Sequence, residues 1–240
     1  MTLLFRWFIL VLATPRGGGN NDKEMRENMK NNLQGHLYLV LLTFLVAGLF
    51  YPAIGLLAII CMLAPVVVSF FRGRYWCGNF CPRGSFYDHV LAKFSPQKTI
   101  PAFLRTTGFR IFALLLVMTA FSIQMYFAWG DLGAMGLVFL RVILLTTLLG
   151  IVLGVIYHQR TWCTFCPMGS LASWIAEKRK PLPLMVSNSC VNCKLCTRVC
   201  PMQLAPYTAK GSASGFDHAD CLKCGRCVAS CPKKALSFDK

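Results

Sequence analysis

Eight of the thirteen cysteines lie near the C-terminus and repeat one spacing. The pattern Cys-x2-Cys-x2-Cys-x3-Cys-Pro occurs first as Cys190, Cys193, Cys196 and Cys200, and then as Cys221, Cys224, Cys227 and Cys231. Three cysteines at this spacing fit one loop around a cubane iron–sulfur cluster, and the fourth, before proline, reaches the neighbouring cluster. The pattern therefore predicts two [4Fe–4S] clusters. Cys190, Cys193, Cys196 and Cys231 would hold one cluster, and Cys200, Cys221, Cys224 and Cys227 the other.

Structural zinc and disulfide bonds are the alternative roles for these thiols. A structural zinc ion takes one closed set of four ligands, which does not account for a tandem repeat with an x3-Pro ending. Disulfides need an oxidising compartment, whereas the distribution of basic residues along the chain places this segment in the cytoplasm. Two clusters therefore explain the spacing better than either alternative.

Four further cysteines belong to a second repeated motif. Its copies span residues 74–85 and 160–170, and their cysteines are Cys77 with Cys81 and Cys163 with Cys166. If one deletion is allowed, Trp, Cys, Phe, Cys, Pro, Gly and Ser recur in order, and each copy follows a pair of hydrophobic segments. Two repeats in the same orientation imply a pseudo-twofold axis along the membrane normal. Such an axis would bring the four cysteines together at one membrane surface.

Three interpretations of these four thiols stay open. The first is a third iron–sulfur centre on an electron path between the membrane and the C-terminal segment. The second is a reversible dithiol pair that carries electrons or exchanges with a partner. The third is structural, with Cys-Pro closing a turn and the thiols buried. The second copy has two residues between its cysteines where the first has three, so equal geometry is not assured.

The elements that carry these motifs are those of a membrane protein. The chain is 55% hydrophobic and yet has a formal charge of +16, a combination that is rare in soluble domains. Residues 37–71 contain no charge and exceed the roughly 20 residues of one span, so we expect two helices with a turn at Tyr51-Pro52. A third span is expected over residues 111–130 and a fourth over 132–157. The expected fold is an α-helical membrane protein of four transmembrane helices in two repeated hairpins, followed by a small α+β domain with two clusters.

Basic residues are concentrated after the second and the fourth span. Seven Lys and Arg lie between residues 72 and 110 and twelve after residue 157, whereas the two opposite turns contain none. By the positive-inside rule this face is cytoplasmic, which predicts a multi-pass protein of a bacterial or archaeal inner membrane with a cytoplasmic C-terminus. The basic residues among the cluster ligands suit anionic lipid or an acidic electron carrier better than nucleic acid.

The domain boundaries follow from these patterns. Residues 1–32 form an N-terminal segment, interfacial or dispensable, whose apolar part is too short to span. Residues 33–180 form the membrane domain, and residues 181–240 form the ferredoxin-like domain. Near the outer surface we expect Arg141 to pair with Asp131, or both to belong to a quinol pocket with Gln124, Tyr126 and Trp129.

Two resemblances support this interpretation. Residues from about 187 to 240, with the two cysteine runs above, resemble a bacterial ferredoxin with two [4Fe–4S] clusters. From about residue 33 onward, the four spans, the paired Trp-Cys…Cys-Pro motifs and the C-terminal cluster segment together resemble the NapH-type membrane polyferredoxins, which are iron–sulfur components of quinol dehydrogenases, and the related CcoG and NosR types. The resemblance implies electron transfer between the quinone pool, cytoplasmic donors and a partner protein.

We therefore expect a membrane-bound electron-transfer subunit of an oxidoreductase complex rather than an enzyme by itself. It would pass single electrons between a quinone pool or a cytoplasmic reductant and a partner oxidoreductase. Two other classes of function stay open. One is a factor that reduces metals or matures another metalloenzyme, and the other is an iron–sulfur redox sensor.

Overall fold

The computed structural model of the protein describes residues 20–238, and it describes side chains from residue 34 onward. The chain divides into two compact units, Met1–Leu33 and Gln34–Lys240. All of the cysteines lie in the second unit. The expectation for residues 1–19 lies outside the described residues.

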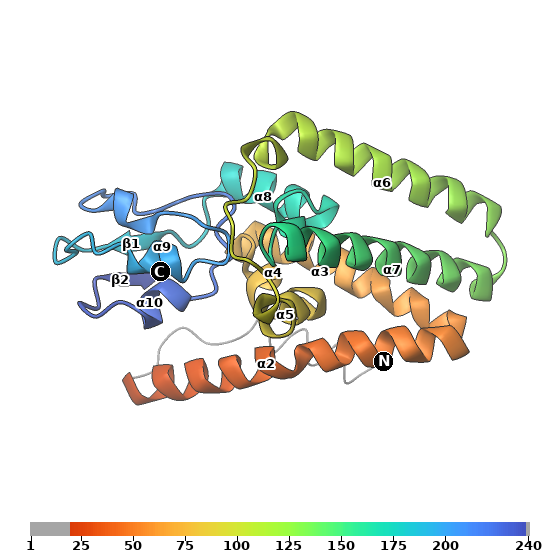
Figure 1. Ribbon diagram of the computed structural model, residues 1–240, viewed down its shortest axis with the longest axis horizontal. Coiled ribbons are helices and arrows are strands. Elements are labelled where there is room, and N and C mark those ends of the chain that lie inside the picture. The colour runs from red at the N-terminus through yellow and green to blue at the C-terminus, as the bar shows by residue number, and fades with distance from the viewer. Residues whose placement is uncertain (1–19, 239–240) are drawn as a thin grey trace. The chain divides into compact units, whose positions relative to one another are not determined.

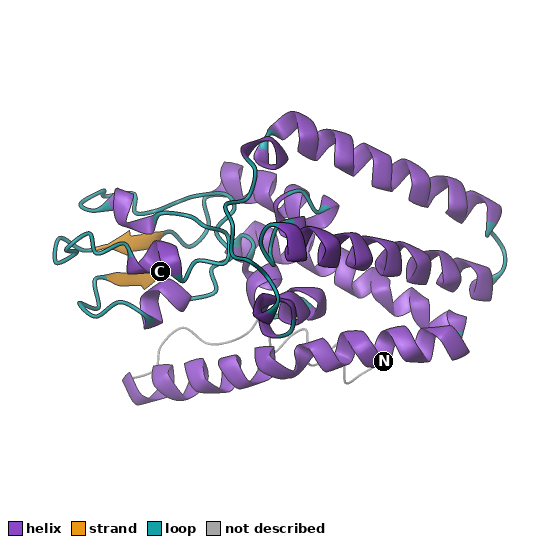
Figure 2. Cartoon of the chain, in the orientation of Figure 1, coloured by secondary structure: helices purple, strands orange, loops and turns teal. Residues whose placement is uncertain are grey.

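Most of the described residues are helical (Figures 1 and 2). The longer helices are α2 (Asn20–Phe50), α3 (Ala58–Arg72), α6 (Thr107–Phe127), α7 (Leu132–Ile156) and α8 (Pro167–Arg179). The shorter elements are η1 (Pro52–Leu57), α4 (Tyr75–Asn79), α5 (Pro82–His89), η2 (Leu91–Lys93), η3 (Ala102–Arg105), η4 (Trp162–Thr164), β1 (Leu184–Val186), α9 (Leu195–Arg198), η5 (Pro206–Ala209), α10 (Arg226–Ala229) and β2 (Leu236–Phe238).

Three helical segments among the described residues are long and apolar enough to cross a membrane. They are Pro52–Arg72, Thr107–Phe127 and Leu132–Ile156. The apolar part of α2, Gln34–Phe50, is shorter, so the fourth span stays a prediction. The turn at Tyr51-Pro52 is confirmed: α2 ends at Phe50 and Pro52 opens η1. Proline ends a helix here because it has no N–H to donate and its ring clashes with the preceding turn.

Close backbone packing joins the two halves within the membrane segments. A Cβ added to Gly55 of η1 would lie 2.1 Å from the carbonyl oxygen of Gly136 of α7, and a Cβ on Gly136 would lie 1.9 Å from that of Pro52. Only glycine permits this approach, which is how small residues let helices pack closely in lipid. The segment η1, which opens the second predicted span, is thereby fixed against α7, the fourth predicted span.

The expected ion pair between Asp131 and Arg141 does not form. Asp131 instead caps α7, where its side chain accepts a hydrogen bond from the backbone N–H of Gly133 at 2.8 Å. Both Asp131 and Arg141 are exposed. A carboxylate at a helix N-terminus satisfies a free N–H group and complements the helix dipole, and this local interaction is favoured over the more distant arginine.

The C-terminal domain repeats its backbone as it repeats its cysteines. Strands β1 and β2 pair antiparallel, with Leu184 opposite Phe238 and Val186 opposite Leu236. The short helices α9 and α10 follow left-handed residues at matching positions, Lys194 and Gly225. Further left-handed residues match between the two cysteine runs, namely Asn192 with Lys223 and Gln203 with Lys234. The two halves are thus related by an approximate twofold repeat, and a small α+β domain results.

Candidate functional site

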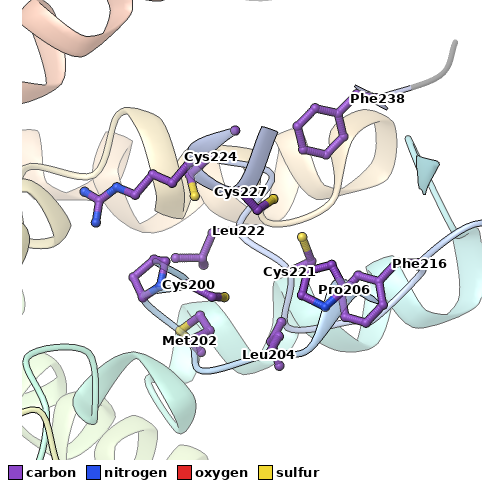
Figure 3. A pocket seen from close by; sticks show the side chains of 13 residues that line it. Cys200, Met202, Leu204, Pro206, Phe216, Cys221, Leu222, Cys224, Cys227 and Phe238 are labelled. Atoms are coloured by element: carbon purple, nitrogen blue, oxygen red, sulfur yellow. The ribbon is translucent and has the colours of Figure 1, made fainter. Parts of the chain in front are cut away.

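The C-terminal domain contains two cavities that are each lined by four thiols. We call one the inner cavity; its cysteines are Cys200, Cys221, Cys224 and Cys227. The other, the outer cavity, is lined by Cys190, Cys193, Cys196 and Cys231. Figure 3 shows the sulfur atoms of the inner cavity arranged around one space. The structure thus brings the eight cysteines together in the same two groups that their spacing predicts, each with one cysteine from the other run.

This donor set fits a cluster rather than a single ion. No group of three or more His, Cys, Asp or Glu side chains among the described residues could hold one metal ion. The four thiols of the inner cavity lie around one space (Figure 3), as ligands of a cluster of several irons do. The role of each cysteine as a ligand stays a prediction.

Burial makes two of the inner thiols weaker acids. It raises the pKa of Cys221 to about 11 and, together with neighbouring thiols, that of Cys227 to about 12. Such thiols remain protonated at neutral pH until a metal displaces the proton. Occupation of the inner cavity is therefore coupled to proton release and to folding of the loop around it.

The second repeated motif forms the surface at the ends of the apolar helices. In each copy the second cysteine is the N-cap residue of a helix with proline at its first position, Cys81 before α5 and Cys166 before α8. The backbone N–H of each donates to the tryptophan carbonyl of its own motif, Trp76 or Trp162, in both cases at 3.0 Å. The extra residue of the first copy is taken up by α4, which stands where the second copy has the tighter turn η4. The two spacings therefore lead to equivalent positions, which the sequence left open.

Two arginines cross between these motifs. Arg74, three residues before Cys77, donates from Nη2 to the carbonyl oxygen of Cys163 at 2.7 Å. Arg160, three residues before Cys163, donates from Nη1 to the carbonyl oxygen of Cys77 at 3.2 Å. The same nitrogen lies 3.6 Å from Sγ of Cys163. Both side chains are only 1% exposed. Each motif is thus completed by the arginine of the other motif.

The glycine of each Cys-Pro-x-Gly-Ser segment gives the arginines room. A Cβ on Gly84 would lie 2.8 Å from Nη1 of Arg160, and a Cβ on Gly169 would lie 2.7 Å from Nη2 of Arg74. The repeated glycine is therefore explained by a guanidinium that passes against the backbone. The following serine is not equivalent in the two copies. Ser85 donates to a backbone carbonyl of α2, whereas Oγ of Ser170 has no hydrogen-bond partner among the described residues.

A buried carboxylate pairs with the arginine that crosses from the second motif. Asp88 accepts from Nε of Arg160 at 2.8 Å and from Nη2 at 2.9 Å. It also accepts from Nη2 of Arg226 at 2.6 Å, and Arg226 lies between two cysteines of the inner cavity. Burial alone would raise the pKa of Asp88, but the two guanidiniums lower it below its ordinary value. Asp88 therefore joins the membrane-surface motif to the C-terminal domain as a charged group.

The arginine that crosses from the first motif pairs with a carboxylate of the C-terminal domain itself. Asp220 accepts from Nη1 of Arg74 at 2.9 Å and from Nη2 of Arg110 at 2.6 Å. Oγ of Ser173 donates to the same carboxylate at 3.0 Å. Burial would raise the pKa of Asp220, but these partners lower it to about 2. When the two motifs are aligned, Ser173 stands at the position of Asp88, so the C-terminal domain supplies the carboxylate that the second motif lacks.

These contacts place the inner cavity directly against the membrane-surface thiols. Asp220 immediately precedes Cys221 of that cavity. A Cβ added to Gly78 would lie 2.4 Å from the carbonyl oxygen of Leu222, so the residues after Cys77 and Cys221 are in backbone contact. Cys77 and Cys163 also pack against the hydrophobic core of the C-terminal domain. The two sets of thiols are therefore neighbours in the fold.

The four membrane-surface thiols also lie within electrostatic range of one another. Burial raises the pKa of Cys77 to about 12, and Cys81, Cys166 and Cys163 add to this effect. Burial likewise raises the pKa of Cys163, with contributions from Cys166 and Cys81. These contributions mean that the four thiols lie near one another, as the internal repeat predicts, and their role as ligands stays a prediction.

The sequence interpretation missed the charged residues of the site. Arg74 and Arg160 each lie three residues before the first cysteine of their motif. This shared spacing could have identified them, but the motif was defined by its Trp, Cys, Phe, Pro, Gly and Ser residues alone. No local signal marks Asp220, because its partner Arg74 is 146 residues away.

Comparison with known protein families identifies both parts of the chain. A family described as "4Fe-4S binding domain" matches residues 54–101 and 133–183, which include both membrane-surface motifs. A family described as "4Fe-4S dicluster domain" matches residues 189–237, which include the eight cysteines of the two cavities.

Individual proteins are similar over most of the chain. An uncharacterized protein of Methanocaldococcus jannaschii, MJ0749, is 30% identical over 76% of this chain and 71% of its own length. A second protein of that organism, MJ0750, is 30% identical over 72% of this chain and 75% of its own length. The ferredoxin-type protein NapH of Haemophilus influenzae is 25% identical over 73% of this chain and 66% of its own length. No solved structure shows significant similarity to the chain.

Proposed function

The chain belongs to the family of ferredoxin-type 4Fe-4S proteins that includes these archaeal relatives and NapH, and we propose that it is a membrane-bound electron-transfer protein. It passes single electrons between a quinone pool or a cytoplasmic reductant and a partner oxidoreductase. The apolar helices anchor it in the inner membrane, and the C-terminal domain lies on the cytoplasmic side, where the basic loops are.

In this proposal the inner and outer cavities each hold one [4Fe–4S] cluster. Such a cluster supplies one-electron chemistry without bond making in the protein. The chain's own residues shield the thiols of the inner cavity, fix the spacing of the cavities and set the surrounding charge. The hydrogen bonds and charges near the sulfur atoms adjust the potential.

The observation that carries the proposal is the contact between the inner cavity and the membrane-surface motifs. Asp220 and Arg226, both beside cysteines of the inner cavity, are tied to buried partners in the membrane-surface part. The residues from Gln34 to the C-terminus form one compact unit. A cluster held by the cysteines of the inner cavity would therefore lie next to Cys77 and Cys163, at the ends of the apolar helices.

We further propose a third iron–sulfur centre on Cys77, Cys81, Cys163 and Cys166. Asp220 faces two buried guanidiniums, those of Arg74 and Arg110, which leaves one surplus buried positive charge in this ion-pair group, whereas the second partner of Asp88, Arg226, is 34% exposed. Buried charge without a counter-charge is costly. A centre held by four thiolates is an anion, since the thiolates outweigh the charge of its iron core, and it would supply that counter-charge.

Unpartnered donors near these thiols support the same proposal. Nε1 of Trp162 and Oη of Tyr87 are buried without a hydrogen-bond partner among the described residues, and both side chains pack in one cluster with Cys163 and Cys166. Nε1 of Trp76, the equivalent tryptophan, is also unpartnered within that part of the chain. Leaving such a donor unsatisfied costs about 1–3 kcal/mol. The sulfur atoms of a bound centre would act as acceptors.

The test is a count of iron and acid-labile sulfide per chain after anaerobic purification, with electron paramagnetic resonance of the reduced protein. About eight of each, with reduction by a quinol analogue, would support electron transfer through the two cavities. A clear excess over eight that disappears in Cys77→Ser and Cys163→Ser, but not in the control Cys61→Ser, would support the third centre. Absence of iron–sulfur signals from the intact protein would refute the proposed function.

A further inference from the structure

The two cysteine runs have the same spacing but opposite exposure. Val191, after the first cysteine of the outer cavity, is 61% exposed, whereas its counterpart Leu222 in the inner cavity is 3% exposed. All residues from 191 to 195 are exposed, while Lys223 and Gly225 of the inner run are buried. The inner run is covered by the membrane-surface motifs, and the outer run is covered by nothing in the described structure. One cavity therefore faces the membrane part, and the other faces solvent.

The uncovered run carries apolar and basic side chains together. We call it the outer surface, and it consists of Val191, Lys194, Leu195, Arg198, Lys233 and Lys234, all of which are exposed. Lys194, Leu195 and Pro232 line the outer cavity, and Lys233 and Lys234 come directly after Pro232 in the chain. None of these basic side chains forms an ion pair with a described residue.

Acidic residues do not balance this charge. Between residues 187 and 238 the only acids are Asp217 and Asp220, and Asp220 is engaged by Arg74 and Arg110. A concentration of one sign of charge around an apolar centre attracts a partner of opposite charge and raises the rate of encounter. The basic and apolar side chains of the outer surface therefore fit a partner whose contact surface is acidic around a small apolar area.

The position of the outer surface favours a protein over a lipid surface. Helix α9, which contains Leu195 and Arg198, lies on the opposite side of α8 from the long helices α6 and α7 (Figure 1). Lipid headgroups would instead meet the basic residues at the helix ends. A soluble carrier that covered the outer surface would stand against the thiols of the outer cavity.

We propose that the outer surface is the docking site of a small, soluble, acidic one-electron carrier protein. This inference rests on the proposed function and names the place where electrons are exchanged with the cytoplasm. One electron passes between the carrier and the chain, so one is oxidised and the other reduced by one electron, with no bond or proton exchanged. Clusters held by the cysteines of the outer and inner cavities would then lie between this docking site and the membrane-surface motifs.

The test measures binding of oxidised flavodoxin, an acidic one-electron carrier, to the full-length protein in nanodiscs. The variant K194E/K233E/K234E reverses three charges of the outer surface. The matched control K178E/K180E/K210E reverses three exposed lysines elsewhere, so both proteins have the same net charge. We expect the outer variant to bind at least about tenfold more weakly at low salt, with the control within about twofold of the unmodified protein. The difference should shrink as salt screens the charges, with a Debye length of about 10 Å at 0.1 M.

Three results bear on the inference separately from the proposed function. Equal weakening in the two variants would show a response to net charge and overturn the docking site. Weakening only in nanodiscs that contain anionic lipid would assign the outer surface to lipid headgroups and overturn it as well. Iron and sulfide content and reduction by dithionite are measured on each variant; if these are normal while flavodoxin binding is unchanged, the docking site is wrong and the proposed function stands.

Discussion

Replacement of Asp220 by asparagine tests whether ion pairs hold the C-terminal domain on the membrane-surface motifs. The partners of Asp220 hold its pKa at about 2, against an ordinary value of 3.8. By linkage this difference corresponds to roughly 2–3 kcal/mol of stability at neutral pH. Because the pKa is lowered in the folded state, this stability is present above about pH 4 and is lost as the pH falls toward 2.

The substitution also leaves two buried guanidiniums, Arg74 and Arg110, without their carboxylate. Removal of one partner of a buried pair costs about 3–5 kcal/mol, which agrees in scale with the value from linkage. For a chain of this size each kcal/mol lowers the unfolding midpoint by about 2–4 °C. We therefore expect the midpoint of Asp220→Asn to fall by roughly 5–20 °C.

The assay is thermal unfolding of the anaerobic protein in nanodiscs, followed by circular dichroism and by cluster absorbance. Asp217→Asn is the matched control, since Asp217 is an acid three residues before Asp220 that takes no part in these ion pairs. Ser173→Ala removes one neutral donor from Asp220 and should cost only about 0.5–1.5 kcal/mol. If Asp220→Asn unfolds at the same temperature as Asp217→Asn, the reasoning about the buried ion pairs is refuted.

Three further substitutions test other parts of the site. Arg160→Gln removes a buried positive charge beside Cys163, so iron above about eight per chain should be lost while the two ferredoxin-type signals remain; retention of all the iron would contradict the proposed counter-charge. Gly84→Ala should destabilise the protein by about 1–3 kcal/mol because its Cβ displaces Arg160, whereas Gly108→Ala, with open space around it, should be neutral or slightly stabilising in thermal unfolding. Cys231→Ser should remove about four irons and the paramagnetic signal that Cys190→Ser also removes; if the lost signal matches that of Cys221→Ser instead, the crossed assignment of the fourth cysteine is wrong.

The parts of the fold that depend on local pattern could be predicted from the sequence. The grouping of the C-terminal cysteines follows from loop spacing, and the break at Tyr51-Pro52 follows from the chemistry of proline. The apolar helices follow from hydropathy, and three of them meet the length needed to cross a membrane. Each of these features is determined by residues close together in the chain.

The electrostatic part of the site could not be predicted, because its partners are distant in sequence. Arg74 bonds to Cys163 across 89 residues, and Arg160 bonds to Cys77 across 83. The one ion pair expected from proximity, Asp131 with Arg141, is replaced by a helix cap. A side chain such as Asp131 bonds most readily to backbone groups next to it in the chain, so an ion pair a few turns away is not assured. Pairs between residues far apart in the chain can be identified only when the fold is known.

The crossed arrangement of arginines and carboxylates has a consequence for how the protein is made. A chain is synthesised from its N-terminus, so Arg74, Arg110 and Arg160 enter the membrane surface before Asp220 and Arg226 exist. Until those last residues arrive, Arg74 and Arg110 cannot be buried without an uncompensated charge, which costs several kcal/mol. We therefore expect the membrane-surface part to close only on a chain whose C-terminal domain has been completed, and truncated products to stay open at this surface and to be more sensitive to proteases.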